Sequence, residues 1–245
     1  MTILFVVLGL VFGSFGSVLV TRIPGGKTIV GRSGCPHCHK TLTPLELIPV
    51  ISYLFLRGRC KECKVPIGWM YPTIEILSAL LFLAAWQLHG EPITAALLGL
   101  VLWLLLIIGF IDAYTQTISD LLNIPLLVLA VLYSMLLGQF EIGGIVLGVA
   151  FFGAQWLLSR GKCLGSGDII LAAGIGALVG SWERMVACLF LVYVIGALIA
   201  STLLLTGRVK RGQYIAFAPF MAIGAIATVF FQSRIDQFIA LYIGI

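Results

Sequence analysis

Charged residues are scarce in this 245-residue sequence. They make up only 10% of it, against roughly 25% in a soluble domain. Apolar residues make up 60%, and the mean hydropathy is +1.13. This shortage of charge excludes an ordinary soluble fold and predicts that most of the surface faces lipid. A basic start and a small-residue cleavage site are also missing around residues 1–20, so we interpret that apolar run as a first membrane span rather than a signal peptide.

Apolar runs separated by glycine, proline and charged residues predict an all-α polytopic membrane protein with about eight transmembrane helices. The expected spans are residues 3–20, 71–88, 93–111, 122–137, 142–158, 169–179, 184–206 and 215–231. The sixth is short and rich in glycine, so we expect it to be lengthened at its ends or packed inside the bundle. The apolar tail 238–245 is too short to cross a bilayer and is expected at the interface.

The distribution of basic residues predicts the orientation, because Lys and Arg beside spans are retained on the cytoplasmic side. If the N-terminus lies outside, all of the 15 Lys and Arg except Arg184 and Arg234 fall on the cytoplasmic side. The net charge of +5 therefore reflects the basic residues that orient the protein in the membrane. Nucleic acid is not an expected partner, because the Lys and Arg residues are scattered over several loops. A nucleic-acid-binding protein would gather them, together with aromatic residues, on one face.

Residues 21–70 form the longest polar segment, which is too small to bury an adequate core unaided. It contains Cys35-Pro-His-Cys38 and Cys60-Lys-Glu-Cys63, two C-x-x-C pairs with 21 residues between them. Four thiolates in this arrangement predict a closed, tetrahedral structural zinc site. Two disulfides are the alternative, but they require an oxidising compartment, and the predicted orientation puts this loop in the reducing cytoplasm.

The other histidine and cysteine residues are not expected to bind the metal. His37 and His39 could replace a thiolate, but four cysteines already fill the site, so both are interpreted as ordinary loop histidines. Cys188 is interpreted as a small apolar residue inside a span. Cys163 lies close to Asp168 in the sequence and is interpreted as a bystander.

Carboxylates are also few, and inside a membrane they are costly and usually functional. Glu75 lies one turn into the second span. There the helix dipole favours a negative charge, so a structural role is preferred over a role as substrate partner. The other dismissed carboxylates lie in outer turns (Glu91, Glu141, Glu183, Asp236) or in the polar loop (Glu46, Glu62).

Asp112 and Asp168 lie at cytoplasmic ends of the third and sixth expected spans, so they can meet if these helices are neighbours. Two carboxylates in hydrogen-bonding reach share one proton, which is the chemistry of aspartic proteolysis. Gly165 and Gly167 leave room for an extended substrate strand beside Asp168. The same residues also fit a proton relay in a transporter, and Asp168 fits a helix cap.

With these residues in place, the chain resembles the type IV prepilin peptidases over nearly its whole length. The motifs that carry the resemblance appear in the family's order: Phe12-Gly-Ser-Phe15, Arg22-Ile-Pro24, Cys35 to Cys38, Leu47-Ile-Pro-Val50, Leu56-Arg-Gly-Arg-Cys60 to Cys63, Tyr71-Pro72 with Glu75, Asp112 and Asp120, Gly165-Ser-Gly-Asp168, and Pro219-Phe220. The resemblance implies a multi-pass protein of the bacterial cytoplasmic (inner) membrane. Its expected organisation is a first helix (1–20), a cytoplasmic four-cysteine domain (21–70) and a helical bundle with the protease site (71–245).

The resemblance further implies that Asp112 and Asp168 are the catalytic pair and that Asp120 is an acidic position that does not cut. It implies cleavage of a basic leader after glycine in type IV prepilins or type II secretion pseudopilins. Many members then methylate the new N-terminal amine with S-adenosylmethionine, whose binding residues the sequence does not identify. Ser17 stands where the family often has Asn, in the region connected with methylation. Three further departures leave every carboxylate in place: Ser119, Ile170 and Ala218.

Overall fold

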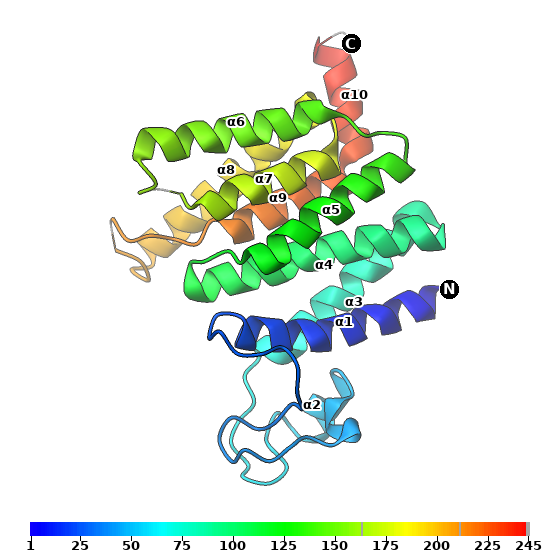
Figure 1. Cartoon of the computed structure of the whole chain (residues 1–245), viewed down its shortest axis with the longest axis vertical. Coiled ribbons are helices and arrows are strands. Elements are labelled where there is room, and N and C mark those ends of the chain that lie inside the picture. Colours follow the sequence, from blue (N-terminus) through cyan, green and yellow to red (C-terminus); the bar gives the residue numbers. More distant parts are fainter. Residues whose placement is uncertain (163, 211, 244–245) are drawn as a thin grey trace. The chain divides into compact units, whose positions relative to one another are not determined.

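The structure is a computed structural model, which describes residues 1–162, 164–210 and 212–243 (Figure 1). Cys163, the expected bystander, lies outside the described residues. The described residues form helices and two isolated backbone bridges. The helices are α1 (Thr2–Arg22), η1 (Pro44–Leu47), α2 (Ile51–Phe55), α3 (Met70–His89), α4 (Pro92–Thr115), α5 (Asp120–Leu136), α6 (Ile142–Ser159), α7 (Ser166–Val179), α8 (Trp182–Leu205), α9 (Ala218–Phe230) and α10 (Gln232–Ile243). The predicted all-α class is confirmed.

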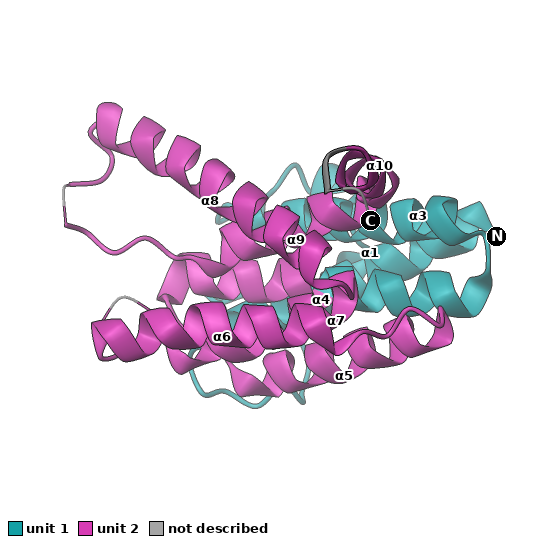
Figure 2. Cartoon of the chain, turned by 90° about the horizontal axis from the view of Figure 1, so that it is seen from above, with its two compact units in different colours: residues 1–103 teal, residues 104–245 magenta. Residues whose placement is uncertain are grey.

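The chain forms two compact units, Met1–Trp103 and Leu104–Ile245, which Figure 2 colours teal and magenta. Helix α4 contributes its first half to unit 1 and its second half to unit 2. The two units are described separately below.

Unit 1 is built on the pairing of α1 with α3. Glycines bring the two backbones into contact, since a Cβ added at Gly9 would lie 2.6 Å from the Cα of Ala79. Close approach through small residues is how helices commonly associate in membranes, where packing replaces the hydrophobic effect between helices. Phe12 of α1 also stacks on Phe82 of α3, with ring centroids 5.4 Å apart. The cysteine-rich loop, with η1 and α2, connects the two helices.

In unit 2, α7 contacts α5, α6, α8 and α9. Residues 171–179 of α7 are all buried. The helix thus packs inside the bundle, as expected for the sixth span, and it gains only three residues at its start. Its contact with α6 depends on glycine, because a Cβ added at Gly176 would clash with the carbonyl oxygen of Gly144.

The number of membrane spans is not confirmed as eight. A helix lies at each of the eight expected positions, but only five of the described helices are long and apolar enough to cross a membrane: α1, α3, α4, α6 and α8. The pair α9 and α10, bent by 75°, makes up to six. Helices α5 and α7 are shorter, at 17 and 14 residues. Residues 238–243 of the apolar tail belong to α10, which already begins at Gln232.

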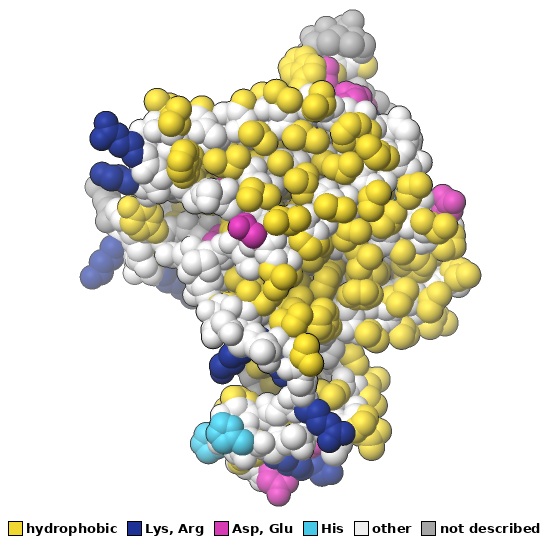
Figure 3. Space-filling view, viewed as in Figure 1, with side chains coloured by type: hydrophobic (Ala, Val, Ile, Leu, Met, Phe, Trp, Pro, Cys, Tyr) yellow, Lys and Arg dark blue, Asp and Glu magenta, His cyan; other side chains and the backbone are white. Residues whose placement is uncertain are grey.

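Most basic residues of unit 2 lie at one of its two ends. Arg160 and Lys162 follow the C-terminal end of α6, and Arg208 and Lys210 follow that of α8. These two helix ends lie on the same side in both ribbon views, and Figure 3 shows basic side chains gathered there beside a largely apolar helical surface. The opposite end of α8 carries Arg184. Such segregation is typical of a protein that spans a membrane.

Candidate active site and metal centre

Asp112 lies in the last turn of α4 and is only 5% exposed. Its Oδ2 accepts a hydrogen bond of 2.9 Å from the backbone N–H of Ala218, the first residue of α9. The carboxylate therefore supplies the acceptor that the exposed N–H groups at a helix start require. One turn earlier, Gly109 has no side chain to separate α4 from α9, and a Cβ there would lie 3.4 Å from the Cα of Pro219.

Asp168 is the third residue of α7 and is 8% exposed. Its Oδ2 accepts a hydrogen bond of 2.8 Å from the N–H of Gly165, which is the N-cap residue of this helix. Asp168 is therefore not the N-cap itself; it folds back onto the N-cap residue from the first turn. This bond fixes the carboxylate at the start of α7.

The glycine turn before Asp168 is held by a residue that sequence reasoning missed. Asn123, fully buried in α5, donates a 2.8 Å hydrogen bond from Nδ2 to the carbonyl oxygen of Gly167. Gly167 packs against the segment before α5, where an added Cβ would lie 2.9 Å from the Cβ of Ile118. The sequence did contain a signal for this role. Asn123 is a polar residue inside the apolar run 122–137, and a buried polar side chain needs a hydrogen-bond partner.

Asp112 and Asp168 lie at the same end of unit 2 and close enough to repel each other electrostatically. Neither forms an ion pair with a Lys or Arg among the described residues. Ionising both members of a desolvated carboxylate pair is costly, so a pair within hydrogen-bonding reach generally retains one proton. Asp120 is different, since it is exposed at the first position of α5, after the N-cap Ser119.

The four cysteines of the loop converge on one centre. The Sγ atoms of Cys35 and Cys63 are 3.8 Å apart, those of Cys38 and Cys60 are 4.0 Å apart, and all four lie within 4.8 Å of one another. Tetrahedral zinc with Zn–S bonds of about 2.3 Å separates its sulfurs by about 3.8 Å, so this set fits the ion. A disulfide would need about 2.05 Å, and these cysteines are free thiols. Neither His37 nor His39 belongs to the cluster.

Both C-x-x-C turns have the same backbone design. The N–H of Cys35 donates to the carbonyl of Lys40, and that of Cys60 donates to the carbonyl of Val65, five residues on in each case. In each turn the residue after the second cysteine has positive φ. A salt bridge of 2.8 Å between Lys40 and Glu62 then joins the two turns. The backbone N–H groups of Cys38 and His37 lower the pKa of Cys35 to about 6, whereas burial and the neighbouring thiols raise the pKa of Cys63 to about 11 despite a hydrogen bond from the backbone of Val65.

Glu75 forms the contact expected of a structural residue, but with the loop rather than within its own helix. It is 8% exposed in α3, and its Oε2 accepts a 2.7 Å hydrogen bond from the N–H of Val50. Glu75 therefore fastens the Leu47-Ile-Pro-Val50 segment of the loop to the membrane helix. The helix-dipole argument alone did not predict this long-range partner.

Two family models match the chain. Residues 7–88 match the bacterial peptidase A24 N-terminal domain, and residues 99–201 match the type IV leader peptidase family. A prepilin leader peptidase/N-methyltransferase of Bacillus subtilis is 36% identical over 97% of both chains. This chain belongs to the type IV leader peptidase family. Two other relatives with that name support the assignment: one of Aeromonas hydrophila is 36% identical over 82% of this chain and 71% of its own, and one of Burkholderia pseudomallei is 37% identical over 92% and 84%.

Membership of the leader peptidase family, together with the apolar helices, identifies a multi-pass protein of the inner membrane. The N-terminal domain match falls inside unit 1, and most of the leader peptidase match falls in unit 2, where the two aspartates lie. No solved structure matches the chain.

Proposed function

We propose that the protein is a membrane-embedded aspartic endopeptidase in which Asp112 and Asp168 are the catalytic pair. Its substrates are type IV prepilins or type II secretion pseudopilins, from which it removes a basic leader. The observation that supports this proposal is that unit 2 contains two buried carboxylates at helix ends, which interact electrostatically and have no basic partner among the described residues. This is the arrangement that general acid–base hydrolysis of a peptide bond needs.

In the reaction, the ionised carboxylate accepts a proton from a water molecule, and the water oxygen attacks the scissile carbonyl carbon. The protonated carboxylate donates its hydrogen to the carbonyl oxygen and stabilises the charge that develops there. Collapse of the intermediate breaks the C–N bond, and the leaving amine takes up a proton from the pair. The N–H groups of Ala218 and Gly165 hold the two carboxylates in position during these steps.

The site lies at the same end of unit 2 as the basic residues that follow α6 and α8. We therefore place this end, and the cysteine-rich loop, in the cytoplasm and the N-terminus outside, in accordance with the retention of basic residues on the cytoplasmic side. A prepilin's basic leader is held on that side by the same rule. The bond between leader and apolar helix then lies at the depth of the two aspartates.

The second proposed activity is methylation of the new N-terminal amine with S-adenosylmethionine, which the names of the relatives indicate. The four-cysteine cluster is proposed to bind one structural zinc ion. Four thiolates complete the coordination of this ion, so it holds the loop together and leaves no open position for substrate.

Incubation of purified protein in lipid vesicles with a pilin precursor tests the proposal. We expect a shortened product whose new N-terminus follows the leader, and a further mass increase of one methyl group when S-adenosylmethionine is added. A proton-coupled transporter that uses the same aspartates would produce neither product. The similar proteins give no support for a transporter. Failure to cut pilin and pseudopilin precursors alike would overturn the proposed peptidase.

A further inference from the structure

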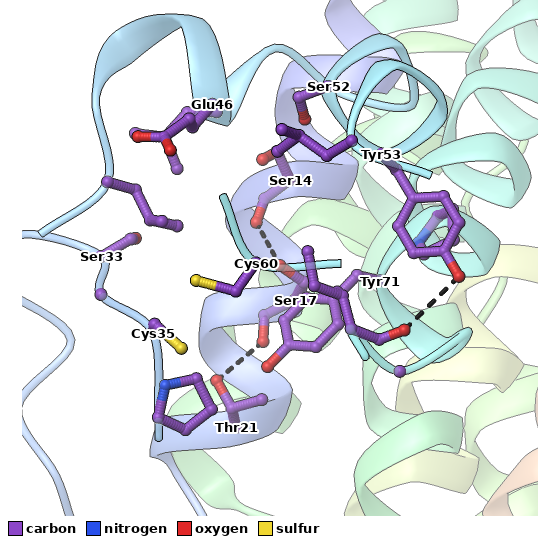
Figure 4. A pocket seen from close by; sticks show the side chains of 18 of the residues that line it. Ser14, Ser17, Thr21, Ser33, Cys35, Glu46, Ser52, Tyr53, Cys60 and Tyr71 are labelled. Atoms are coloured by element: carbon purple, nitrogen blue, oxygen red, sulfur yellow. Dashed lines mark hydrogen bonds between the residues drawn. The ribbon is translucent and has the colours of Figure 1, made fainter. Parts of the chain in front are cut away.

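Three hydroxyl groups on the wall of a cavity in unit 1 have hydrogen-bond partners within the chain. This cavity has a volume of about 250 Å³ and lies between α1, the cysteine-rich loop and α3 (Figure 4). The hydroxyl groups of Ser17, Thr21 and Tyr53 each donate to a backbone carbonyl oxygen. The carboxylate of the cavity, Glu75, accepts from the N–H of Val50. A buried donor that still needs a partner lies in unit 2.

This donor is the amide nitrogen of Gln155, in the last turns of α6. Its Nε2 is buried and has no hydrogen-bond partner in the part of the chain that the structure describes. Its Oε1 accepts a hydrogen bond of 3.0 Å from the hydroxyl of Tyr193 in α8. The bond to Tyr193 therefore orients the amide so that its N–H groups are left for another acceptor. A buried amide donor without an acceptor is costly.

Gln155 lies close to the level of Asp168 along α6. Helices α6 and α7 are neighbours that run in opposite directions, and a Cβ added at Gly148 would lie 2.9 Å from the carbonyl oxygen of Ala172. One turn further along both helices, this register places Phe152 level with Asp168. Gln155 follows Phe152 by three residues, or about 4.5 Å at 1.5 Å per residue. The amide is displaced by this distance towards the basic end of unit 2.

An aromatic cluster connects the same region to Asp112. Phe217 directly precedes Ala218, whose N–H binds the Asp112 carboxylate. The centroid of the Phe217 ring lies 5.9 Å from that of Phe152 and 5.6 Å from that of Tyr193. The amide that Tyr193 holds and both proposed catalytic carboxylates therefore border one aromatic cluster, which α6, α8 and the start of α9 form.

We propose that Nε2 of Gln155 binds a backbone carbonyl oxygen of the substrate on the leader side of the scissile bond, and that Tyr193 positions the amide for this contact. The inference rests on the proposed peptidase and assigns substrate-binding residues to it. A substrate must be extended where it reaches the aspartates, and extension frees carbonyl groups that lipid cannot satisfy. Gln155 is partly exposed, so rotation of its terminal amide presents the donor to such a carbonyl.

The position of the amide also predicts which carbonyl it binds. Gln155 lies nearer than Phe152 to the basic end of unit 2, the proposed cytoplasmic end, where the leader is held. An extended chain that runs along α6 advances about 3.3 Å per residue. The offset of about 4.5 Å along α6 therefore corresponds to a carbonyl one or two residues before the scissile carbonyl.

Gln155→Met in the full-length protein tests the contact, because it keeps the length of the side chain and removes the donor. Cleavage of a membrane-embedded pilin precursor should slow about tenfold or more, which corresponds to about 1.4 kcal/mol. The unfolding temperature should not fall, since the variant loses an unsatisfied buried donor. Tyr193→Phe keeps the donor but not its orienting hydroxyl, so its loss should be smaller. Leu157→Met is the matched control on α6, because Leu157 is 70% exposed, and it should cut at the wild-type rate.

Ester substitution in the precursor distinguishes substrate binding from a structural role of Gln155. An ester carbonyl is a weaker hydrogen-bond acceptor than an amide carbonyl, and it is introduced one or two residues before the scissile carbonyl. At one of these positions, the ester should slow wild-type cleavage at least about twofold more than it slows cleavage by Gln155→Met, as expected for groups in contact. Equal slowing of both enzymes at both positions would overturn the contact.

Failure of this inference differs from failure of the proposed peptidase. Absence of cleavage by the wild-type protein would overturn the peptidase itself. Cleavage by Gln155→Met within about threefold of the wild-type rate, well inside the tenfold that corresponds to 1.4 kcal/mol, would overturn only the role of Gln155.

Should Gln155→Met fail to fold, photo-crosslinking decides the matter. A benzophenone amino acid replaces Phe151, whose ring lies 5.8 Å from that of Tyr193 and which is 37% exposed. With the Asp112→Asn protein and an intact precursor, this probe should label the junction between the leader and the apolar helix. The same probe at Phe231, which follows α9 at its other end and is 61% exposed, is the control. Absence of labelling from position 151, or equal labelling from position 231, would overturn the site.

Discussion

At the scale of single residues, each proposed catalytic carboxylate is held by a backbone N–H group. The N–H of Ala218 is 106 positions away from Asp112, and that of Gly165 is three positions away from Asp168. These bonds fix the orientation of both side chains before substrate arrives. Pre-organisation of this kind is what allows a pair of ordinary carboxylates to perform general acid–base catalysis.

Asp112→Asn and Asp168→Asn should each reduce leader cleavage by at least about 100-fold, because an amide cannot exchange the proton that the pair must pass between base and acid. Each asparagine can still accept the backbone hydrogen bond of the aspartate, so the protein should remain inserted at wild-type levels. Asp120→Asn is the matched control, since Asp120 is exposed, and it should cut nearly as fast as wild type. Quantifying precursor and product on gels checks all three, and near-normal cleavage by either of the first two variants would contradict the assignment.

Asn123→Ala should weaken both cleavage and stability. It removes the donor to the carbonyl of Gly167, and a buried acceptor left without a partner costs about 1–3 kcal/mol. Ser134→Ala is the control on the same helix, because the Ser134 hydroxyl donates only to the carbonyl of Val131 in its own helix. Thermal unfolding in detergent and cleavage assays should separate the two variants, and identical behaviour would show that the Gly167 turn does not depend on Asn123.

The sequence predicted the positions of Asp112 and Asp168 at helix ends because short motifs specify local backbone conformation. It did not predict three hydrogen bonds around the carboxylates. Ala218 donates to Asp112, Asn123 donates to the carbonyl of Gly167 beside Asp168, and Val50 donates to Glu75. Those contacts join segments 25 to 106 residues apart, and hydrophobic periodicity carries no information about which helices become neighbours. The number of eight spans is not confirmed for another reason: helices such as α7 are buried by protein, so their length need not match the bilayer.

At the scale of structural elements, the two C-x-x-C turns depend on a shared ion. We expect purified protein to contain about one zinc per chain. Replacing any one of Cys35, Cys38, Cys60 or Cys63 by Ser should release the ion, because three thiolates no longer close the site. Acid should also release it, since protons compete for the thiolates. Elemental analysis across a pH series checks this, and cysteines that resist alkylation until reduced would indicate disulfides instead.

The contact between α6 and α7 gives a second element-scale prediction. A Cβ at Gly144 would clash with the carbonyl oxygens of both Gly180 and Gly176, so Gly144→Ala should force the helices apart and destabilise unit 2 by about 1–3 kcal/mol. Gly153→Ala is the matched control on the same helix, because nothing lies within 4 Å of its added Cβ. That variant should be neutral or stabilising, since alanine favours helix. Equal unfolding temperatures for the two variants would contradict the glycine contact.

At the scale of the whole molecule, the membrane should act as part of the substrate-binding apparatus. A precursor anchored by its apolar helix holds its scissile bond at the depth of the aspartates, and this raises its effective concentration at the site. A soluble peptide that contains the cleavage site but lacks the helix should therefore be cut far more slowly. Moving the bond one helical turn deeper should also slow cleavage, because freed backbone groups in lipid cost several kcal/mol each. Equal turnover of soluble and embedded substrates in vesicles would refute this account.

The burial of α7 has a consequence for biosynthesis. At 14 residues, this helix is too short and too rich in glycine to partition into a bilayer as an independent segment. Two of its main packing partners, α5 and α6, precede it in the chain and are synthesised first. When α7 leaves the ribosome, the groove that receives it can already be in place. Helices α5 and α6 thus provide the packing surface that lipid alone does not provide for such a short helix. Asp168 lies in the first turn of α7, so it reaches its final position only when α7 docks.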